Sequence, residues 1–132
     1  MSRRRAREAA FKVLFQVDQV DNAPGPAFEH LLEEWPLSTE NKEFAWQLIE
    51  GTLREQQELD RGIMQYASRE WSLGRMAPVD RCLLRLAAFE MLCADAPQAP
   101  AVVIDEALEL AKRYSEAGSV AFINAILDRM KR

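Results

Sequence analysis

The chain has 132 residues, of which 48% are apolar and 29% are charged, and its formal net charge is −4. This length and composition indicate one globular domain and exclude a disordered, fibrous or disulfide-stapled secreted protein. No apolar run approaches the roughly 20 residues of a membrane-spanning helix, and no signal segment follows the charged N-terminus, so we expect a cytosolic protein.

The six prolines divide the chain into segments with helical periodicity. Proline opens or ends a helix but is poorly tolerated inside one. The predicted helical segments lie near residues 3–22, 27–35, 38–68, 78–94, 101–115 and 119–131. Apolar residues recur at helical spacing in each longer segment. We expect Ser38 or Thr39 to cap the third segment, Pro78 to open the fourth and Ser119 to cap the last.

Signals for β-strands are nearly absent. The single β-branched run, residues 102–104, leads directly into a helical segment, and no Asn-Gly or Asp-Gly hairpin turn occurs. The expected fold is all-α, a compact bundle of six to seven helices around one core, with residues 1–132 in a single domain. A fresh helix start after residues 75–77 suggests two helical halves, about 1–68 and 69–132.

The cysteines and the histidine argue against a disulfide and a zinc site. Cys82 and Cys93 lie in one predicted helix, about 16 Å apart along its axis, whereas a disulfide needs Cα atoms within about 7 Å. Each cysteine is expected to be a small buried hydrophobic residue. His30 is the only histidine, and no Cys-x-x-Cys or His-Glu-x-x-His motif is present, so we expect no metal.

Catalytic and cofactor-binding motifs are missing. The sequence contains no Gly-x-Gly-x-x-Gly or Walker loop, no Gly-x-Ser-x-Gly elbow and no second histidine for a triad. Adjacent acids such as Asp105 and Glu106 point about 100° apart on a helix and suit a first helical turn, where the dipole favours anions. We therefore expect neither enzyme activity nor a cofactor.

The charges are distributed unevenly along the chain. Residues 1–12 carry a net charge of +4, residues 13–60 carry −9 and residues 61–132 carry +1. Such asymmetry is typical of a basic end that meets phosphate and an acidic body that meets something else.

The positive charge is concentrated in Arg3, Arg4, Arg5 and Arg7, where the first helix is expected to begin. Cations at a helix N-terminus oppose its dipole, and a sequence that breaks a local rule often does so for function. A guanidinium group binds phosphate through two parallel hydrogen bonds. These arginines are candidate phosphate contacts, and the alternative is a solvated, frayed terminus.

Six short stretches of the chain match, in order and spacing, those of one known family. They are residues 3–8 (RRRARE), 48–51 (LIEG), 71–73 (WSL), 80–90 (DRCLLRLAAFE), 104–114 (IDEALELAKRY) and 122–128 (FINAILD). Through them the chain resembles the NusB family of bacterial transcription antitermination factors over nearly its whole length. The resemblance implies an all-helical fold of two three-helix-like halves. It also implies binding of boxA-type single-stranded RNA together with the small ribosomal-subunit protein NusE, a pair that helps RNA polymerase resist termination on ribosomal RNA operons.

The resemblance also implies roles for individual residues. It places RNA contacts at Arg3, Arg4, Arg5, Arg7, Lys112, Tyr114 and Phe122. It places the contact with NusE at Tyr66 and Asp80. Tyr114 and Phe122 fit the apolar stripes equally well and so have a core position as their alternative. Asp80 also fits the first turn of a helix that begins at Pro78.

Two residues depart from the family pattern, and two other functions stay open. Gly118 stands where an acidic or polar residue is often found, and Ala125 replaces the glycine of an Asn-Gly pair; both changes concern the C-terminal part of the RNA-binding surface. The alternatives are a NusB-like accessory domain of an RNA methyltransferase and a helical adaptor that binds only protein. The sequence leaves open whether the free protein forms a homodimer.

Overall fold

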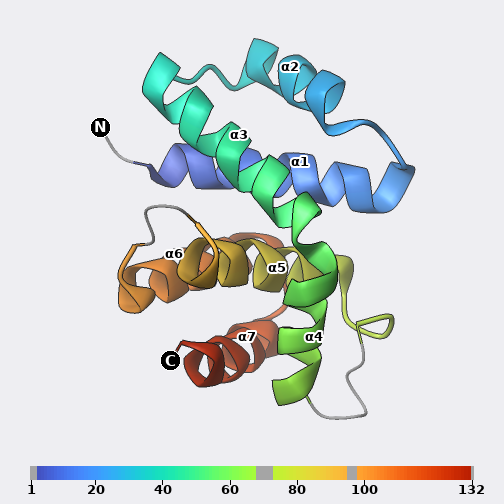
Figure 1. The fold of residues 1–132 in the computed structure, drawn as a ribbon, viewed down its shortest axis with the longest axis vertical. Coiled ribbons are helices and arrows are strands. Elements are labelled where there is room, and N and C mark those ends of the chain that lie inside the picture. The colour runs from blue at the N-terminus through green and yellow to red at the C-terminus, as the bar shows by residue number, and fades with distance from the viewer. Residues whose placement is uncertain (1–2, 68–72, 95–97, 132) are drawn as a thin grey trace.

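The computed structural model describes residues 3–67, 73–94 and 98–131, and these form seven helices and no strand. The helices are α1 (Arg4–Val20), α2 (Pro24–Glu34), α3 (Thr39–Arg54), α4 (Gln56–Tyr66), α5 (Pro78–Leu92), α6 (Pro100–Tyr114) and α7 (Ala117–Met130). No helix in the described part of the chain is long and apolar enough to cross a membrane. The all-α fold expected from the sequence is confirmed (Figure 1).

Local sequence signals account for most of the helix starts. Pro24, Pro78 and Pro100 stand in the first turns of α2, α5 and α6, where a missing backbone N–H costs no hydrogen bond. Ser38 caps α3, because its Oγ accepts a hydrogen bond from the backbone N–H of Asn41 at 3.2 Å. The predicted segments therefore begin close to the observed helices.

Three helix boundaries differ from the prediction, and one of them is the start of α2, which lies at Pro24, three residues before the predicted segment 27–35. Segment 38–68 is two helices, because the backbone departs from helical values at Glu55 (φ −95°, ψ 11°) and α4 turns toward α5 and α7. No proline or glycine stands at this break, so the sequence carries no local signal for it. Ser119 does not cap the last helix, which begins at Ala117, because its hydroxyl donates a hydrogen bond to Asp80.

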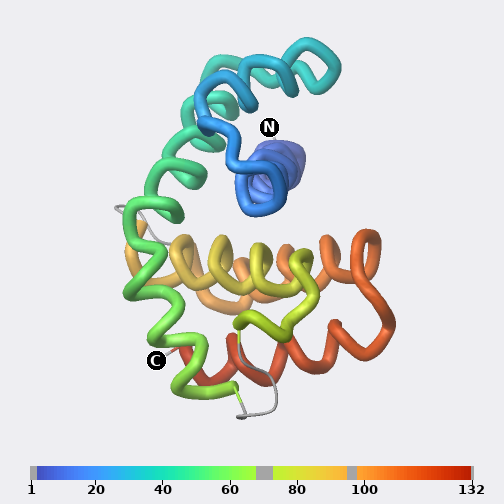
Figure 2. The backbone as a smooth tube through the Cα atoms, turned by 90° about the vertical axis from the view of Figure 1, so that its right-hand side faces the viewer, coloured from blue at the N-terminus to red at the C-terminus, as the bar shows by residue number. Residues whose placement is uncertain are grey.

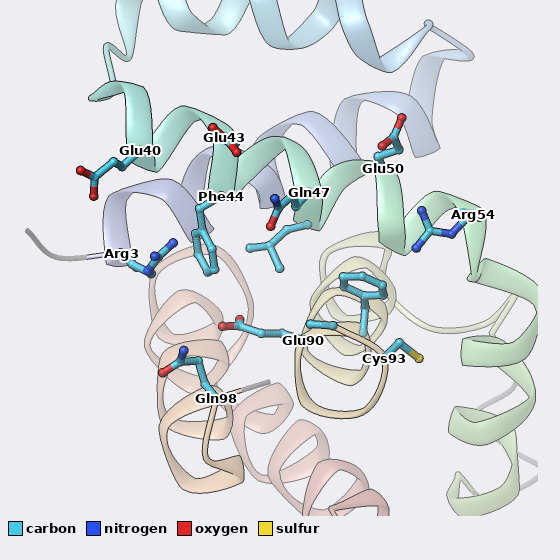
Figure 3. A pocket seen from close by; sticks show the side chains of 13 residues that line it. Arg3, Glu40, Glu43, Phe44, Gln47, Glu50, Arg54, Glu90, Cys93 and Gln98 are labelled. Carbon is cyan, nitrogen blue, oxygen red and sulfur yellow. The ribbon is translucent and has the colours of Figure 1, made fainter. Parts of the chain in front are cut away.

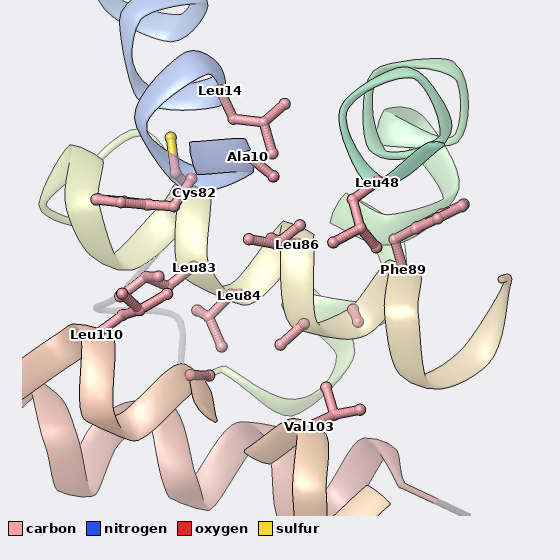
Figure 4. Packing of buried hydrophobic residues seen from close by; sticks show 14 of the residues in the cluster. Ala10, Leu14, Leu48, Cys82, Leu83, Leu84, Leu86, Phe89, Val103 and Leu110 are labelled. Carbon is pink, nitrogen blue, oxygen red and sulfur yellow. The ribbon is translucent and has the colours of Figure 1, made fainter. Parts of the chain in front are cut away.

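Helix α5 is the centre of the molecule. It packs against α1, α3, α4, α6 and α7, and Figure 2 shows α1 lying between the arch of α2 and α3 on one side and α5 on the other. Its buried residues, among them Leu83, Leu86 and Phe89, meet neighbours from several helices (Figure 4). All seven described helices contribute to one continuous apolar core.

Helices α1, α2 and α3 pack on one another, α4 packs mainly against α5 and α7, and α5 contacts both sets. The two halves of about 1–68 and 69–132 stay a prediction from the sequence. Because Leu59 and Ile63 form an apolar stripe on α4, this helix needs a partner surface, which α5 and α7 provide.

An ionic network ties α1 and α4 to α5. Asp18 accepts hydrogen bonds from Arg81 (2.7 Å) and Arg85 (3.3 Å), and Arg85 also donates to Asp60 (2.7 Å). Burial alone would raise the pKa of Asp18, but the hydrogen bond and charge of Arg81 lower it below its ordinary value. Asp18 is therefore held in its ionised form, as the network requires.

The two cysteines differ in exposure. Cys82 is buried in α5, where burial raises the pKa of its thiol to about 12. Cys93, at the end of α5, is exposed, so the expectation that both are buried is wrong for this residue. Both are free thiols, as the helix geometry requires.

Candidate nucleic-acid interface

Three of the four arginines at the start of α1 are exposed, namely Arg3, Arg4 and Arg5. Arg3 is the N-cap residue but its side chain makes no capping hydrogen bond, and the first turn of α1 contains no acidic residue. This helix end therefore presents positive charge at the place where the helix dipole favours negative charge.

Aromatic rings hold two of these guanidinium groups. The Cζ atom of Arg3 lies 4.0 Å from the ring centroid of Phe44, and that of Arg5 lies 4.2 Å from the ring centroid of Trp35. Such cation–π contacts orient a side chain without neutralising its charge. The chain is thus helical from Arg4, and two of its exposed arginines rest on aromatic rings.

Arg7, by contrast, is buried. Its guanidinium forms a two-point ion pair with Glu90 of α5, with N–O distances of 2.6–3.0 Å, and lies 3.9 Å from Glu106 of α6. Glu106 also accepts a hydrogen bond from Arg4 at 2.9 Å. These contacts fasten α1 to α5 and α6. Arg7 is expected from the resemblance to contact RNA, but its guanidinium is paired with Glu90 inside the protein.

Lys112 and Tyr114 lie at the end of α6. Lys112 is exposed and pairs with Glu109 at 3.1 Å. Tyr114 is 36% exposed, its ring centroid lies 5.2 Å from that of Phe11, and its hydroxyl donates a hydrogen bond to Glu8. Tyr114 is thus anchored on α1 but keeps part of its ring accessible, which a base-stacking residue needs.

Phe122 and the two unusual residues lie along α7. Phe122 is half-buried and packs against the apolar core. Gly118 and Ala125 are both exposed, and a Cβ added at Gly118 would meet no atom within 4 Å. The departures from the family pattern therefore change the surface of α7 and leave the core unaffected.

The residues expected to contact NusE differ in their surroundings. Asp80, in the first turn of α5, is buried and accepts hydrogen bonds from the hydroxyls of Ser115 (2.5 Å) and Ser119 (2.7 Å). Its carboxylate thus ties the start of α5 to the connection between α6 and α7. Tyr66 is half-buried at the end of α4.

The fold brings the candidate RNA contacts of α1 and α6 together. Arg4 reaches Glu106 and Glu8 reaches Tyr114, across sequence separations of 102 and 106 residues. Tyr66 belongs instead to α4, which packs on α5 and α7. The residues expected to bind RNA and those expected to bind the partner protein therefore lie on different elements.

The residues that surround the exposed arginines were not among those predicted from the sequence. Phe44 and Trp35 hold guanidinium groups, and the Nζ atom of Lys12 lies 3.7 Å from the ring centroid of Trp35. Lys12 could have been found, because it follows Arg5 by seven residues and so lies on the same face of a helix. Trp35 carries no such signal, since only the packing of α2 on α1 brings it there.

A cavity of about 470 Å³ opens beside Arg3, between α3 and the end of α5 (Figure 3). The charged residues of its lining are Glu40, Glu43, Glu50, Glu90, Arg3 and Arg54. The excess of carboxylates disfavours a phosphate group in this cavity. Within the described residues, no cluster of three or more potential metal ligands is found. The candidate site is therefore the basic surface of α1, outside the cavity.

Comparison with known proteins shows to which family the chain is similar. Residues 4–132 match the model of the NusB family. The transcription antitermination protein NusB of Syntrophomonas wolfei is 52% identical over 130 residues, which cover 98% of this chain and 96% of that protein. The solved structure of T. maritima NusB has a TM-score of 0.90 and 39% identity, covering 99% of this chain and 91% of that one.

A solved complex of the antitermination factors NusB and NusE with dsRNA contains a chain that matches with a TM-score of 0.89 and 28% identity. The match covers 98% of this chain and 95% of that one. Sequence and fold thus agree over almost the full length, and the chain belongs to the NusB family.

Proposed function

We propose that this protein is a transcription antitermination factor that binds boxA-type RNA together with NusE and supports readthrough by RNA polymerase on ribosomal RNA operons. The observation that carries the proposal is the cluster of exposed arginines at the start of α1, on a chain of the NusB family. Relatives named as antitermination proteins and the solved complex of NusB and NusE with dsRNA support it.

In this proposal Arg3, Arg4 and Arg5 are the phosphate contacts. Their side chains are exposed at one helix end, where Arg4 also pairs with Glu106, and a planar guanidinium can form two hydrogen bonds with one phosphate. Arg7 contributes by holding α1 on α5 through Glu90.

The C-terminal contacts supply stacking and further charge. Lys112 is exposed, and the accessible parts of Tyr114 and Phe122 offer rings to unpaired bases. Stacking of a base on an aromatic side chain is worth about 1–3 kcal/mol. These rings therefore matter most if the bound RNA is single-stranded.

For the partner protein, Tyr66 is the proposed direct contact. Asp80 acts indirectly, because its carboxylate holds Ser115 and Ser119 at the connection between α6 and α7. The proposed role is regulatory, is carried out by binding without a catalytic step, and takes place in the cytoplasm with the transcription machinery.

Filter binding with boxA-like and scrambled RNA, each with and without NusE, tests the proposal. We expect boxA-like RNA to be preferred and its binding to be strengthened by NusE. Binding of NusE without any RNA binding would instead indicate a protein-binding adaptor. RNA binding that neither prefers boxA nor responds to NusE would favour an accessory domain of an RNA methyltransferase.

A further inference from the structure

Trp35 brings two cations of α1 together on one surface. It is the C-cap residue of α2, and its indole ring lies beside α1. The Cζ atom of Arg5 is 4.2 Å and the Nζ atom of Lys12 is 3.7 Å from the centroid of this ring. The indole Nε1–H also donates a hydrogen bond to the backbone carbonyl of Arg5 at 3.1 Å, which fixes the ring relative to α1.

Among the described residues, Arg5 and Lys12 differ from the arginines that form ion pairs in having no acidic partner. Arg4, Arg7, Arg81 and Arg85 each pair with a carboxylate. Within the described residues, neither Arg5 nor Lys12 has a carboxylate at ion-pair distance, and Arg5 donates only to the carbonyl of Pro36 at 3.4 Å. An aromatic ring attracts a cation through its quadrupole and leaves the full positive charge in place. The charges of Arg5 and Lys12 therefore stay available to an anion.

The spacing of the two cations suits a nucleic-acid strand. Arg5 and Lys12 are seven residues apart, so they lie on the same face of α1. Because their charged atoms are 4.2 Å and 3.7 Å from the same ring centroid, the two charges are no more than about 8 Å apart. Phosphates of a stacked strand are separated by about 3.4 Å along its axis. The two cations can therefore contact phosphates about two nucleotides apart.

We propose that Lys12 and Trp35 extend the RNA-binding surface from the arginines at the start of α1 to the end of α2. Lys12 is a phosphate contact, and Trp35 is a positioning residue that holds Arg5 and Lys12 in the direction that the phosphates require. A long flexible side chain loses conformational freedom when it binds, and the indole reduces this loss by ordering Lys12 beforehand. The inference rests on the proposed function, since RNA is the ligand.

The test measures the affinity of the full-length protein with NusE for boxA-like RNA at several salt concentrations. We expect Lys12→Gln to lower the slope of log K against log salt by about 0.7 and the affinity by roughly fivefold at 0.1 M salt. Trp35→Leu removes no charge, yet it should also lower the slope, because Arg5 and Lys12 lose their common support. Lys131→Gln is the control that removes one lysine charge elsewhere, because Lys131 is an exposed residue at the end of α7 and pairs with Asp128 at 2.8 Å.

The outcomes separate this inference from the function on which it rests. If Lys12→Gln has the same RNA affinity and salt slope as Lys131→Gln, while the unmodified protein binds boxA-like RNA, the inference is wrong. A weaker Trp35→Leu variant with an unchanged slope would also overturn it, because such a loss is merely structural. If Trp35→Leu fails to fold, as circular dichroism would show, Lys12→Gln alone decides. Absence of RNA binding by the unmodified protein would contradict the proposed function itself.

Discussion

Burial decides what each arginine at the start of α1 does. Arg3 and Arg5 are exposed and rest on aromatic rings, whereas Arg7 is buried in an ion pair with Glu90. Removing one partner from a buried pair leaves an uncompensated charge and typically costs about 3–5 kcal/mol. Substitution of Arg7 would therefore change the fold before it reported on RNA binding, and only the exposed arginines can be tested cleanly.

The first prediction concerns those exposed arginines. Replacement of Arg3, Arg4 and Arg5 by alanine should weaken RNA binding and flatten its salt dependence by about 0.7 per lost contact on single strands. The melting temperature should fall only slightly, because cations at a helix N-terminus oppose its dipole and surface ion pairs contribute little. Affinity measurements at graded salt check this, and a triple variant with an unchanged slope would contradict it.

The second prediction concerns Tyr114. Burial, followed by the hydrogen bond that its hydroxyl donates to Glu8, raises the pKa of Tyr114 to about 12. An unfolded tyrosine ionises near pH 10, so this contact stabilises the protein fully below pH 10 and is lost as the pH rises toward 12.

An alkaline titration followed by tyrosinate absorbance, with Tyr114→Phe subtracted, should therefore show a midpoint near 12. The difference in unfolding free energy between the unmodified protein and Tyr114→Phe should shrink between pH 10 and pH 12. A midpoint at the ordinary value near 10 would mean that the hydroxyl does not bond to Glu8 in solution.

At the scale of the elements, the close approach of α3 to α5 depends on Gly51. A Cβ at this position would overlap the ring of Phe89, which is buried against α3. The glycine matters here for the space it leaves, since no described glycine has a positive φ. The approach matters for the candidate site, because α3 also carries Phe44, on which Arg3 rests.

The third prediction compares two glycines in helices. Gly51→Ala should lower the unfolding free energy by up to about 2 kcal/mol, because overpacking costs about 1–3 kcal/mol and alanine returns about 1 kcal/mol of helix propensity. Gly118→Ala is the control and should raise stability by about 0.4–1 kcal/mol, since its Cβ meets no atom within 4 Å. Urea unfolding measures both, and equal stability of the two variants would show that Phe89 yields without cost.

Asp80 connects the start of α5 to α6 and α7. From the sequence, Asp80 is either a partner contact or a first-turn acid of α5. The structure places it in that first turn and also makes it the acceptor for Ser115 and Ser119. Because these two hydroxyls lie on either side of the α6–α7 connection, Asp80 ties this connection to the start of α5.

At the scale of the whole molecule, the charge distribution limits what the protein can bind alone. Residues 1–12 carry +4, but residues 13–60 carry −9 and supply several carboxylates to the cavity beside Arg3. Charges beyond about 8 Å are largely screened at physiological salt, yet the basic surface is small. We therefore expect modest RNA binding by the protein alone.

The fourth prediction is that NusE strengthens RNA binding through a coupling free energy of about 1–3 kcal/mol. A basic partner adds phosphate and base contacts that the acidic body lacks, and reciprocity requires RNA to tighten the binding of NusE by the same factor. Titration calorimetry of the binary and ternary mixtures measures both factors. Equal RNA affinity with and without NusE would mean that the two ligands bind independently.

Much of the fold could be predicted because its signals are local. Pro78 and Pro100 begin helices through their fixed φ, and Ser38 caps α3 through a hydrogen bond to a residue three positions away. The break at Glu55 has no such signal, because α4 turns there to bury its apolar stripe on α5 and α7. That choice depends on surfaces that only the folded chain provides.

The candidate site divides in the same way. The sequence by itself determined the all-α class, most helix starts and the concentration of arginines at the beginning of α1, because each depends on residues within a few positions of one another. Only the tertiary structure decided that Arg7 is buried against Glu90. It also decided that Asp80 accepts hydrogen bonds from two serines and that the Trp35 ring contacts Arg5 and Lys12. These contacts join residues 23 to 83 positions apart, and such pairs meet only when the burial of apolar surface packs the helices together.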